Sequence, residues 1–205
     1  MNDDQEQHDR EEQGRGADGD YGGRPETDER FIHLLRAGTS LLKQGKASDA
    51  LPYLREAYAL NPESLDAALN LSGAFILDKK FSKAVPILER LRKEYPENAM
   101  VLTNLGAAYL GNPILATEEH QMRAIEAFQE ALEVNPDAPS VAYNIGLIYR
   151  DRQEKEEAIR WFRRAVETNP GDRDARSIMK RLERDLADGD EEEHDAPPGG
   201  NGQVV

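Results

Sequence analysis

The chain has 205 residues, of which 32% are charged and 6% are aromatic. It contains no cysteine, which excludes disulfides, thiolate metal sites and a cysteine nucleophile. No apolar run reaches the roughly 18 residues that a membrane span needs, and residues 1–30 lack the apolar core of a signal peptide. We therefore expect a cytoplasmic protein that does not bind membranes.

The formal net charge of −14 is located at the two ends of the chain. Residues 1–30 contain 11 acidic and 4 basic side chains, and residues 185–205 contain 7 acidic and no basic ones. The net charge of residues 31–184 is therefore zero. Neither end has an apolar periodicity, so neither can bury enough apolar surface to offset the entropy of ordering. We predict disordered acidic tails at 1–28 and 189–205. Because no basic stripe is present, nucleic acid is not an expected partner.

Between the tails, four similar units follow one another. Each unit closes with an Xaa-Pro turn, and the four prolines are separated by 34, 40 and 34 residues. A small residue recurs in the first half of each unit, and an alanine recurs in the second half. These positions are Gly38, Ser72, Gly106 and Gly146, followed by Ala50, Ala84, Ala124 and Ala158.

The spacing within a unit predicts a pair of helices. Leu102, Leu105 and Tyr109 follow the i, i+3, i+7 spacing of one helix face. Small residues let two helix backbones approach closely, while large residues fill the remaining space. Proline ends the second helix, because it cannot continue the hydrogen-bond ladder. Since one pair cannot bury its own apolar face, neighbouring pairs should stack into a solenoid.

These units resemble tetratricopeptide repeats, a family with helix–turn–helix units of about 34 residues. The resemblance covers residues 31–172 and implies an all-α fold, a right-handed superhelical solenoid of four helix pairs. It places the folded domain at residues 29–188. The four units are residues 31–64, 65–98, 99–138 and 139–172.

Two further features complete the predicted domain. Residues 172–188 are typical of a capping helix that packs on the last unit. Its apolar face consists of Ala175, Ile178, Met179 and Leu182. Pro52 and Pro86 occupy the same position in units one and two, near the start of the second helix, where proline disturbs a helix least.

The third unit contains a six-residue insertion, residues 111–116. Thr117 should cap the helix that follows, with acidic residues in its first turn, where the helix dipole favours negative charge. Ile114 and Leu115 are apolar residues on the inserted loop. They either contact a partner or pack back over the unit, and both interpretations stay open.

No catalytic or metal-binding arrangement is evident in the sequence. The four histidines are scattered, and no glycine-rich phosphate loop, HExxH or GxSxG sequence occurs. His120 lies one helical turn before Ala124, which favours a partly buried structural histidine. The acidic run 190–193 is typical of a solvated tail. We expect no enzymatic activity, no cofactor and no metal site.

The resemblance implies that the first helix of each pair lines a concave groove. Asparagine recurs at one groove position, and an amide both donates and accepts hydrogen bonds, so it can bind a peptide backbone. The alternative is that these asparagines only fix local geometry. The predicted groove residues are Asn70, Gly73, Thr103, Asn104, Ala107, Tyr143, Asn144 and Leu147.

The kind of ligand follows from the remaining groove positions. The Lys/Asn clamp with which some members of the family bind a C-terminal carboxylate is matched only at Asn70. The groove positions are mostly apolar and small, which suits a helix or an apolar peptide. The sequence thus predicts a non-enzymatic adaptor or scaffold that binds a protein or peptide partner of unspecified identity. The alternative is structural self-assembly, in which the repeats form a homo-oligomer.

Overall fold

The structure is a computed structural model that describes the backbone of residues 25–194 and the side chains of residues 27–188 except Ile114. All secondary structure in this part of the chain is helical. The helices are α1 (Pro25–Lys43), α2 (Ala47–Leu60), α3 (Leu65–Leu77), α4 (Phe81–Glu94), α5 (Ala99–Leu110), the short 3-10 helix η1 (Pro113–Leu115), α6 (Glu118–Val134), α7 (Val141–Asp151), α8 (Lys155–Thr168) and α9 (Arg173–His194).

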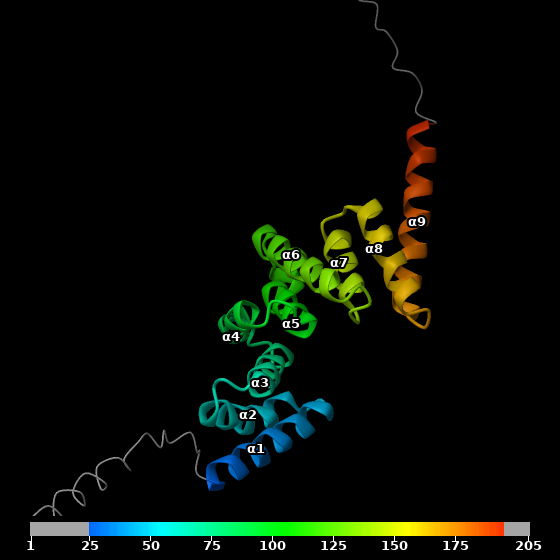
Figure 1. Ribbon diagram of the computed structural model, residues 1–205. Helices are drawn as coiled ribbons and strands as arrows, with labels where there is room; N and C mark the ends of the chain where they lie inside the picture. Colours follow the sequence, from blue (N-terminus) through cyan, green and yellow to red (C-terminus); the bar gives the residue numbers. More distant parts are fainter. Residues whose placement is uncertain (1–24, 195–205) are drawn as a thin grey trace, which may run out of the picture.

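The helices pack in pairs, α1 with α2, α3 with α4, α5 with α6, and α7 with α8. Successive pairs follow one another along a curved array, and α9 packs on α8 at its end (Figure 1). Each second helix ends directly before its Xaa-Pro turn, as predicted. These observations confirm the all-α fold of stacked helix pairs.

Close approach of the two helices in a pair depends on the recurring small residue. A Cβ atom at Gly38 would lie 2.5 Å from Cγ of Leu54, and one at Gly146 would lie 3.0 Å from the Phe162 ring. Ser72 takes this place in unit two, where it is fully buried and its hydroxyl donates to the Leu69 carbonyl over 2.9 Å. The small residue therefore leaves room for the large side chain of the second helix, which fills the centre of each pair.

An arginine in the second helix links a unit to the turn that closes the unit before it. Arg90 donates to the Pro62 carbonyl over 2.9 Å, and Arg164 donates to the Pro136 carbonyl over 3.3 Å. Proline removes a donor from the turn, but its carbonyl stays available as an acceptor. The sequence pattern did not identify these arginines, because their partners lie 28 residues away in the chain.

Both internal prolines lie deeper in their helices than predicted. Pro52 and Pro86 are each the sixth residue of a 14-residue helix, beyond the first turn. A proline there lacks the N–H that the carbonyl four residues earlier would normally accept from, so the Ser82 carbonyl loses its helical donor. Both prolines are exposed, and neither interrupts its helix. The prediction that both prolines lie at the start of the helix, where proline disturbs it least, was therefore wrong.

The two ends of the described chain extend the predicted domain. α1 begins at Pro25, and proline is favoured at the first position of a helix. α9 buries Ala175 and Leu182 against the last unit, with Ile178 and Met179 partly buried, as predicted. It continues to His194 through a run of glutamates, which are good helix formers. The remainder of the predicted disordered tails, residues 1–24 and 195–205, lies outside the described residues.

Candidate functional site

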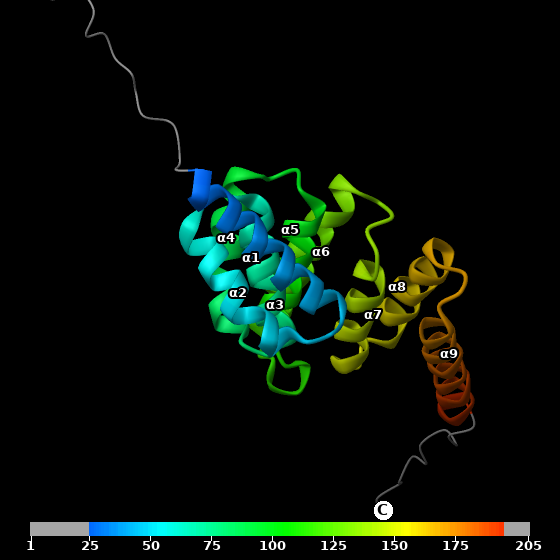
Figure 2. The same cartoon turned by 90° about the horizontal axis from the view of Figure 1, so that it is seen from below.

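The first helices of successive pairs form the candidate concave surface. α1 packs against α3, and α3 packs against α5 (Figure 2). Asn70, Asn104 and Asn144 occupy the same position on α3, α5 and α7 and are all half-buried. The other predicted groove residues, Gly73, Thr103, Ala107, Tyr143 and Leu147, are half-buried as well. A Cβ atom at Gly73 would meet nothing within 4 Å, so this helix has open space beside it.

One end of this surface is bordered by charged side chains. A hollow of about 520 Å³ lies between α1 and α3, and Asn70 is part of its wall. Its other polar lining residues include Arg36 and Lys43 from α1 and Asp66 from α3, with Leu35 as the apolar contribution. Two bases and one acid give this end of the surface an excess of positive charge. Charged side chains therefore border the groove at its first unit.

Tyr143 contributes to packing as well as to the surface. Its ring lies edge-on to Phe162 of α8, with ring centroids 5.6 Å apart and an interplanar angle of 67°. It also lines a hollow of about 250 Å³ between the α6–α7 loop and the α8–α9 turn. Burial raises the pKa of the Tyr143 hydroxyl, and the charges of Asp174 and Asp172 raise it further. The neutral phenol is therefore the stable form at physiological pH.

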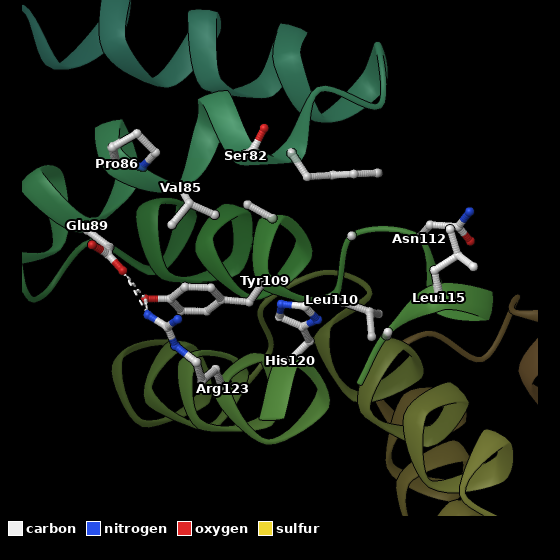
Figure 3. Close-up of a pocket in the computed structure, with 14 residues that line it drawn as sticks. Ser82, Val85, Pro86, Glu89, Tyr109, Leu110, Asn112, Leu115, His120 and Arg123 are labelled. Atoms are coloured by element: carbon white, nitrogen blue, oxygen red, sulfur yellow. Dashed lines mark hydrogen bonds and ion pairs between the residues drawn. The ribbon is translucent and has the colours of Figure 1, made fainter. Parts of the chain in front are cut away.

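The insertion in unit three builds a separate hollow of about 460 Å³. It lies between α4, the end of α5, the inserted segment and the start of α6 (Figure 3). We call this hollow the insert pocket. None of the eight predicted groove residues lines it. Its apolar lining consists of Phe81, Val85, Pro86, Ala108, Tyr109, Leu110, Leu115 and Ala116.

The inserted segment is held by the start of α6. The Thr117 hydroxyl accepts from the backbone N–H of His120, and the His120 ring nitrogen Nδ1 accepts from the N–H of Thr117. With Glu118 and Glu119 in the first turn, this confirms the predicted cap. His120 itself is exposed, so the predicted partial burial was wrong. Its ring turns back to the helix start and lines the insert pocket instead of entering the core (Figure 3).

The two apolar residues of the inserted loop, Ile114 and Leu115, both belong to η1. Leu115 is 75% exposed and lines the insert pocket at its rim. The backbone of Ile114 belongs to η1, but its side chain lies outside the described residues. Leu115 therefore contributes little to the core of unit three.

A hydrogen-bonded cluster closes one end of the insert pocket. The Tyr109 hydroxyl donates to Oε1 of Glu89 over 2.7 Å, and Nη2 of Arg123 donates to the same oxygen over 2.9 Å (Figure 3). The Arg123 guanidinium also lies 4.1 Å from the centroid of the Tyr109 ring. Burial raises the pKa of the Tyr109 hydroxyl, and its bond to the Glu89 carboxylate raises it further. The tyrosine therefore stays a neutral donor.

The sequence pattern identified only Tyr109 of this cluster, and only as a packing residue. Glu89, Tyr109 and Arg123 come from three helices. Glu89 and Arg123 lie at positions where side-chain type varies between units, so no repeated residue marks them. One sequence signal for the Tyr109 contact was available, because an aromatic residue recurs at this position of the first helix. In the structure, Phe75 at the same position also has a cation over its ring. The Arg55 guanidinium lies 5.3 Å from the centroid of the Phe75 ring.

Comparison with known families decides what these helix pairs are. Family models described as tetratricopeptide repeat match residues 41–110 and 118–173. The chain belongs to the tetratricopeptide repeat family. The inserted residues lie in the gap between the two matched segments, and four of them line the insert pocket.

Curated relatives of this tetratricopeptide repeat protein include two assembly proteins and one subunit of a complex. The photosystem I assembly protein Ycf3 of Synechococcus sp. (strain CC9605) is 34% identical over 40% of this chain and 52% of its own length. The type IV pilus assembly protein PilF of Pseudomonas aeruginosa is 28% identical over 72% of this chain and 56% of its own length. Anaphase-promoting complex subunit 7 of Mus musculus is 26% identical over 65% of this chain. The match to this subunit spans 23% of its length, so the chain covers about half or less of each relative.

Solved structures show the same fold. A tetratricopeptide repeat protein from Thermus thermophilus superposes with a TM-score of 0.66 at 22% identity, over 78% of this chain and 85% of that one. A point mutant of MamA superposes with a TM-score of 0.61 at 23% identity, over 80% of this chain and 92% of that one. Among the helices of residues 25–194, none is long and apolar enough to cross a membrane.

Proposed function

We propose that this chain is an adaptor that holds a segment of a partner protein along α1, α3, α5 and α7. Tetratricopeptide repeat domains generally mediate protein–protein interaction, and the relatives named above are assembly proteins or complex subunits. The observation that carries the proposal is the recurrence of a half-buried asparagine on α3, α5 and α7, beside open space at Gly73. Such amides can pair with both the N–H and the C=O groups of an extended chain.

The bound segment should differ in character along its length. Near α1, the surplus of Arg36 and Lys43 over Asp66 favours an acidic or neutral residue. Around Gly73 and Ala107, the small side chains leave room for a bulkier apolar residue of the ligand. In this arrangement, the asparagines bind the backbone of the segment, and the residues around them select its side chains.

A photo-crosslinking amino acid at position 73 tests the proposal. The position has free space, so the substitution should leave the fold intact, and a partner held in the groove should be crosslinked there. The matched control is the same substitution at Arg160, an exposed residue of α8. Once the crosslinked segment is sequenced, Asn104→Ala should weaken its binding by about 0.5–1.5 kcal/mol by calorimetry. Crosslinking from position 160 alone, or unchanged binding by the Asn104 variant, would contradict the proposal.

Self-assembly is the second candidate function. Exposed apolar side chains occur on three first helices, at Ile32 of α1, Leu77 of α3 and Met100 of α5. Such residues can be covered by a second copy of the chain. Light scattering during size exclusion tests this candidate, because a monomer at high protein concentration would exclude it.

A further inference from the structure

We infer that the insert pocket is a second binding site, which takes one uncharged aromatic side chain of a partner protein, with tryptophan the best fit. The site does not depend on the concave groove, because none of the eight groove residues lines it. It is formed by the second helices α4 and α6, the end of α5 and the insertion, whereas the proposed groove belongs to the first helices. Binding at one site is therefore compatible with binding at the other.

The walls of the insert pocket favour an apolar group. Phe81 and Val85 of α4, Leu110 of α5 and Leu115 of the insertion present apolar surface around a volume of about 460 Å³. Leu115 leaves 75% of its surface in water, and burying that surface against a ligand is favourable. A volume of this size lies within the range for ligand pockets, so a large side chain has room to enter it.

The charges of the pocket favour a neutral group. Glu89 and Arg123 are bound to each other, and the raised pKa of Tyr109 keeps this side chain neutral. A charged ligand would lose hydration on entry without gaining an unpaired counter-ion, which is unfavourable. The ion pair instead closes one end of the pocket and leaves its remaining lining without net charge.

One backbone carbonyl of α4, at a residue that lines the pocket, lacks its helical donor. Ser82 and Pro86 both line the pocket, and Pro86 has no N–H to donate to the Ser82 carbonyl. A backbone carbonyl without its helical donor accepts a hydrogen bond from a ligand at little cost. An indole combines a large apolar body with one N–H donor, which makes tryptophan a better fit than leucine or phenylalanine.

The chain's own terminal segments are poor candidates for the occupant. Residues 1–24 contain a single aromatic residue, Tyr21, and carry eight acidic side chains. Residues 195–205 contain no aromatic residue. The composition of both segments disagrees with a neutral aromatic pocket, so the occupant should come from another protein.

The test uses the full chain with isotope-labelled methyl groups and N-acetyl-tryptophanamide as the probe. In nuclear magnetic resonance titrations, the methyl signals of Val85, Leu110 and Leu115 should shift and saturate, with a dissociation constant on the order of 1 mM. The methyl groups of Leu69 and Leu147, on the groove helices, should not shift. N-acetyl-aspartamide, which carries a charge, should produce no saturable shift at any of these positions.

Variants locate the binding and separate it from the groove. Ser82→Trp fills the pocket from an exposed position and should weaken probe binding by about tenfold or more, and Leu115→Ser should weaken it by roughly threefold. Met100→Ser removes another exposed apolar side chain, 62% exposed, from the start of unit three and should leave binding unchanged. Asn104→Ala should also leave it unchanged, so failure of the groove proposal and failure of the pocket proposal give different results.

Three results would overturn the inference. The first is the absence of saturable shifts at Val85, Leu110 and Leu115 up to about 20 mM probe. The second is unchanged probe binding in both the Ser82 and the Leu115 variants, provided that circular dichroism shows a native helical signal. The third is a nuclear Overhauser contact between the pocket methyl groups and residues 1–24, which would show that the chain fills the pocket itself.

Discussion

A Cβ atom at Gly106 would lie 2.5 Å from Cδ1 of Phe128, well inside van der Waals contact. Phe128 is fully buried in the main core cluster, so displacing its ring disturbs close packing. The glycine is therefore required by packing between α5 and α6, although its backbone conformation is helical. The same contact recurs between Gly38 and Leu54 in unit one.

We predict opposite effects of alanine at two glycines of the same fold. Gly106→Ala should lower the free energy of unfolding by roughly 1–3 kcal/mol, because the new methyl group displaces the Phe128 ring. Gly73→Ala should raise it by about 0.5–1 kcal/mol, because alanine is the better helix former and meets nothing within 4 Å. Urea denaturation of both variants measures the two changes. Equal effects of both substitutions would mean that the pairing of helix faces is wrong.

The helix pairs could be predicted from the sequence, because the residues that specify them lie close together and recur in every unit. A small residue, an alanine and an Xaa-Pro turn recur in register, and these residues specify the ends and the facing sides of each helix. The cap at Thr117 was predictable for the same reason, since its acceptor and donor lie within one turn. The positions of Pro52 and Pro86 within their helices were predicted wrongly. The N-termini of α2 and α4 have no side-chain cap, so the sequence did not mark where these helices begin.

The insert pocket could not be predicted in the same way. Its lining comes from three helices and an insertion that has no counterpart in the other units, so no repeat position marks it. The interaction of Glu89, Tyr109 and Arg123 depends on side-chain directions across α4, α5 and α6, which spacing alone does not give. His120 shows the limit most directly, because its helical spacing indicated a core face, whereas the ring is used to cap its own helix.

The Tyr109 hydroxyl should make stability depend on pH in the alkaline range. Its pKa in the folded chain is raised above the ordinary value near 10, so the stability due to the neutral hydroxyl is present below about pH 10 and is lost as the pH rises through the folded pKa. Tyr109→Phe should reduce stability by about 1 kcal/mol at neutral pH and by less above that range. Denaturation of both proteins across alkaline pH measures the difference. A constant difference would show that the hydroxyl stays protonated or contributes nothing.

The terminal segments should be dispensable for folding. Residues 25–194 contain all the described helices, and the sequences outside them bring no apolar face. This shortened chain should melt cooperatively, at the same midpoint temperature as the full chain. Its circular dichroism should show the same total helical signal. A chain of residues 28–188 should melt slightly earlier, because it lacks Pro25 and the last turns of α9. Loss of cooperativity in residues 25–194 would show that an end segment is part of the core.

The packing of Tyr143 against Phe162 changes how its contribution to binding must be tested. Tyr143→Ala removes the edge-on ring contact and should destabilise unit four by about 1–3 kcal/mol, so reduced partner binding by this variant would be ambiguous. Tyr143→Phe keeps the ring and removes only the hydroxyl, and it should leave the melting temperature nearly unchanged. If the hydroxyl binds a partner segment, the Phe variant should lose about 0.5–1.5 kcal/mol of affinity by calorimetry. Unchanged affinity in Tyr143→Phe, together with a loss in Asn104→Ala, would restrict the contact to the asparagines and assign Tyr143 to packing alone.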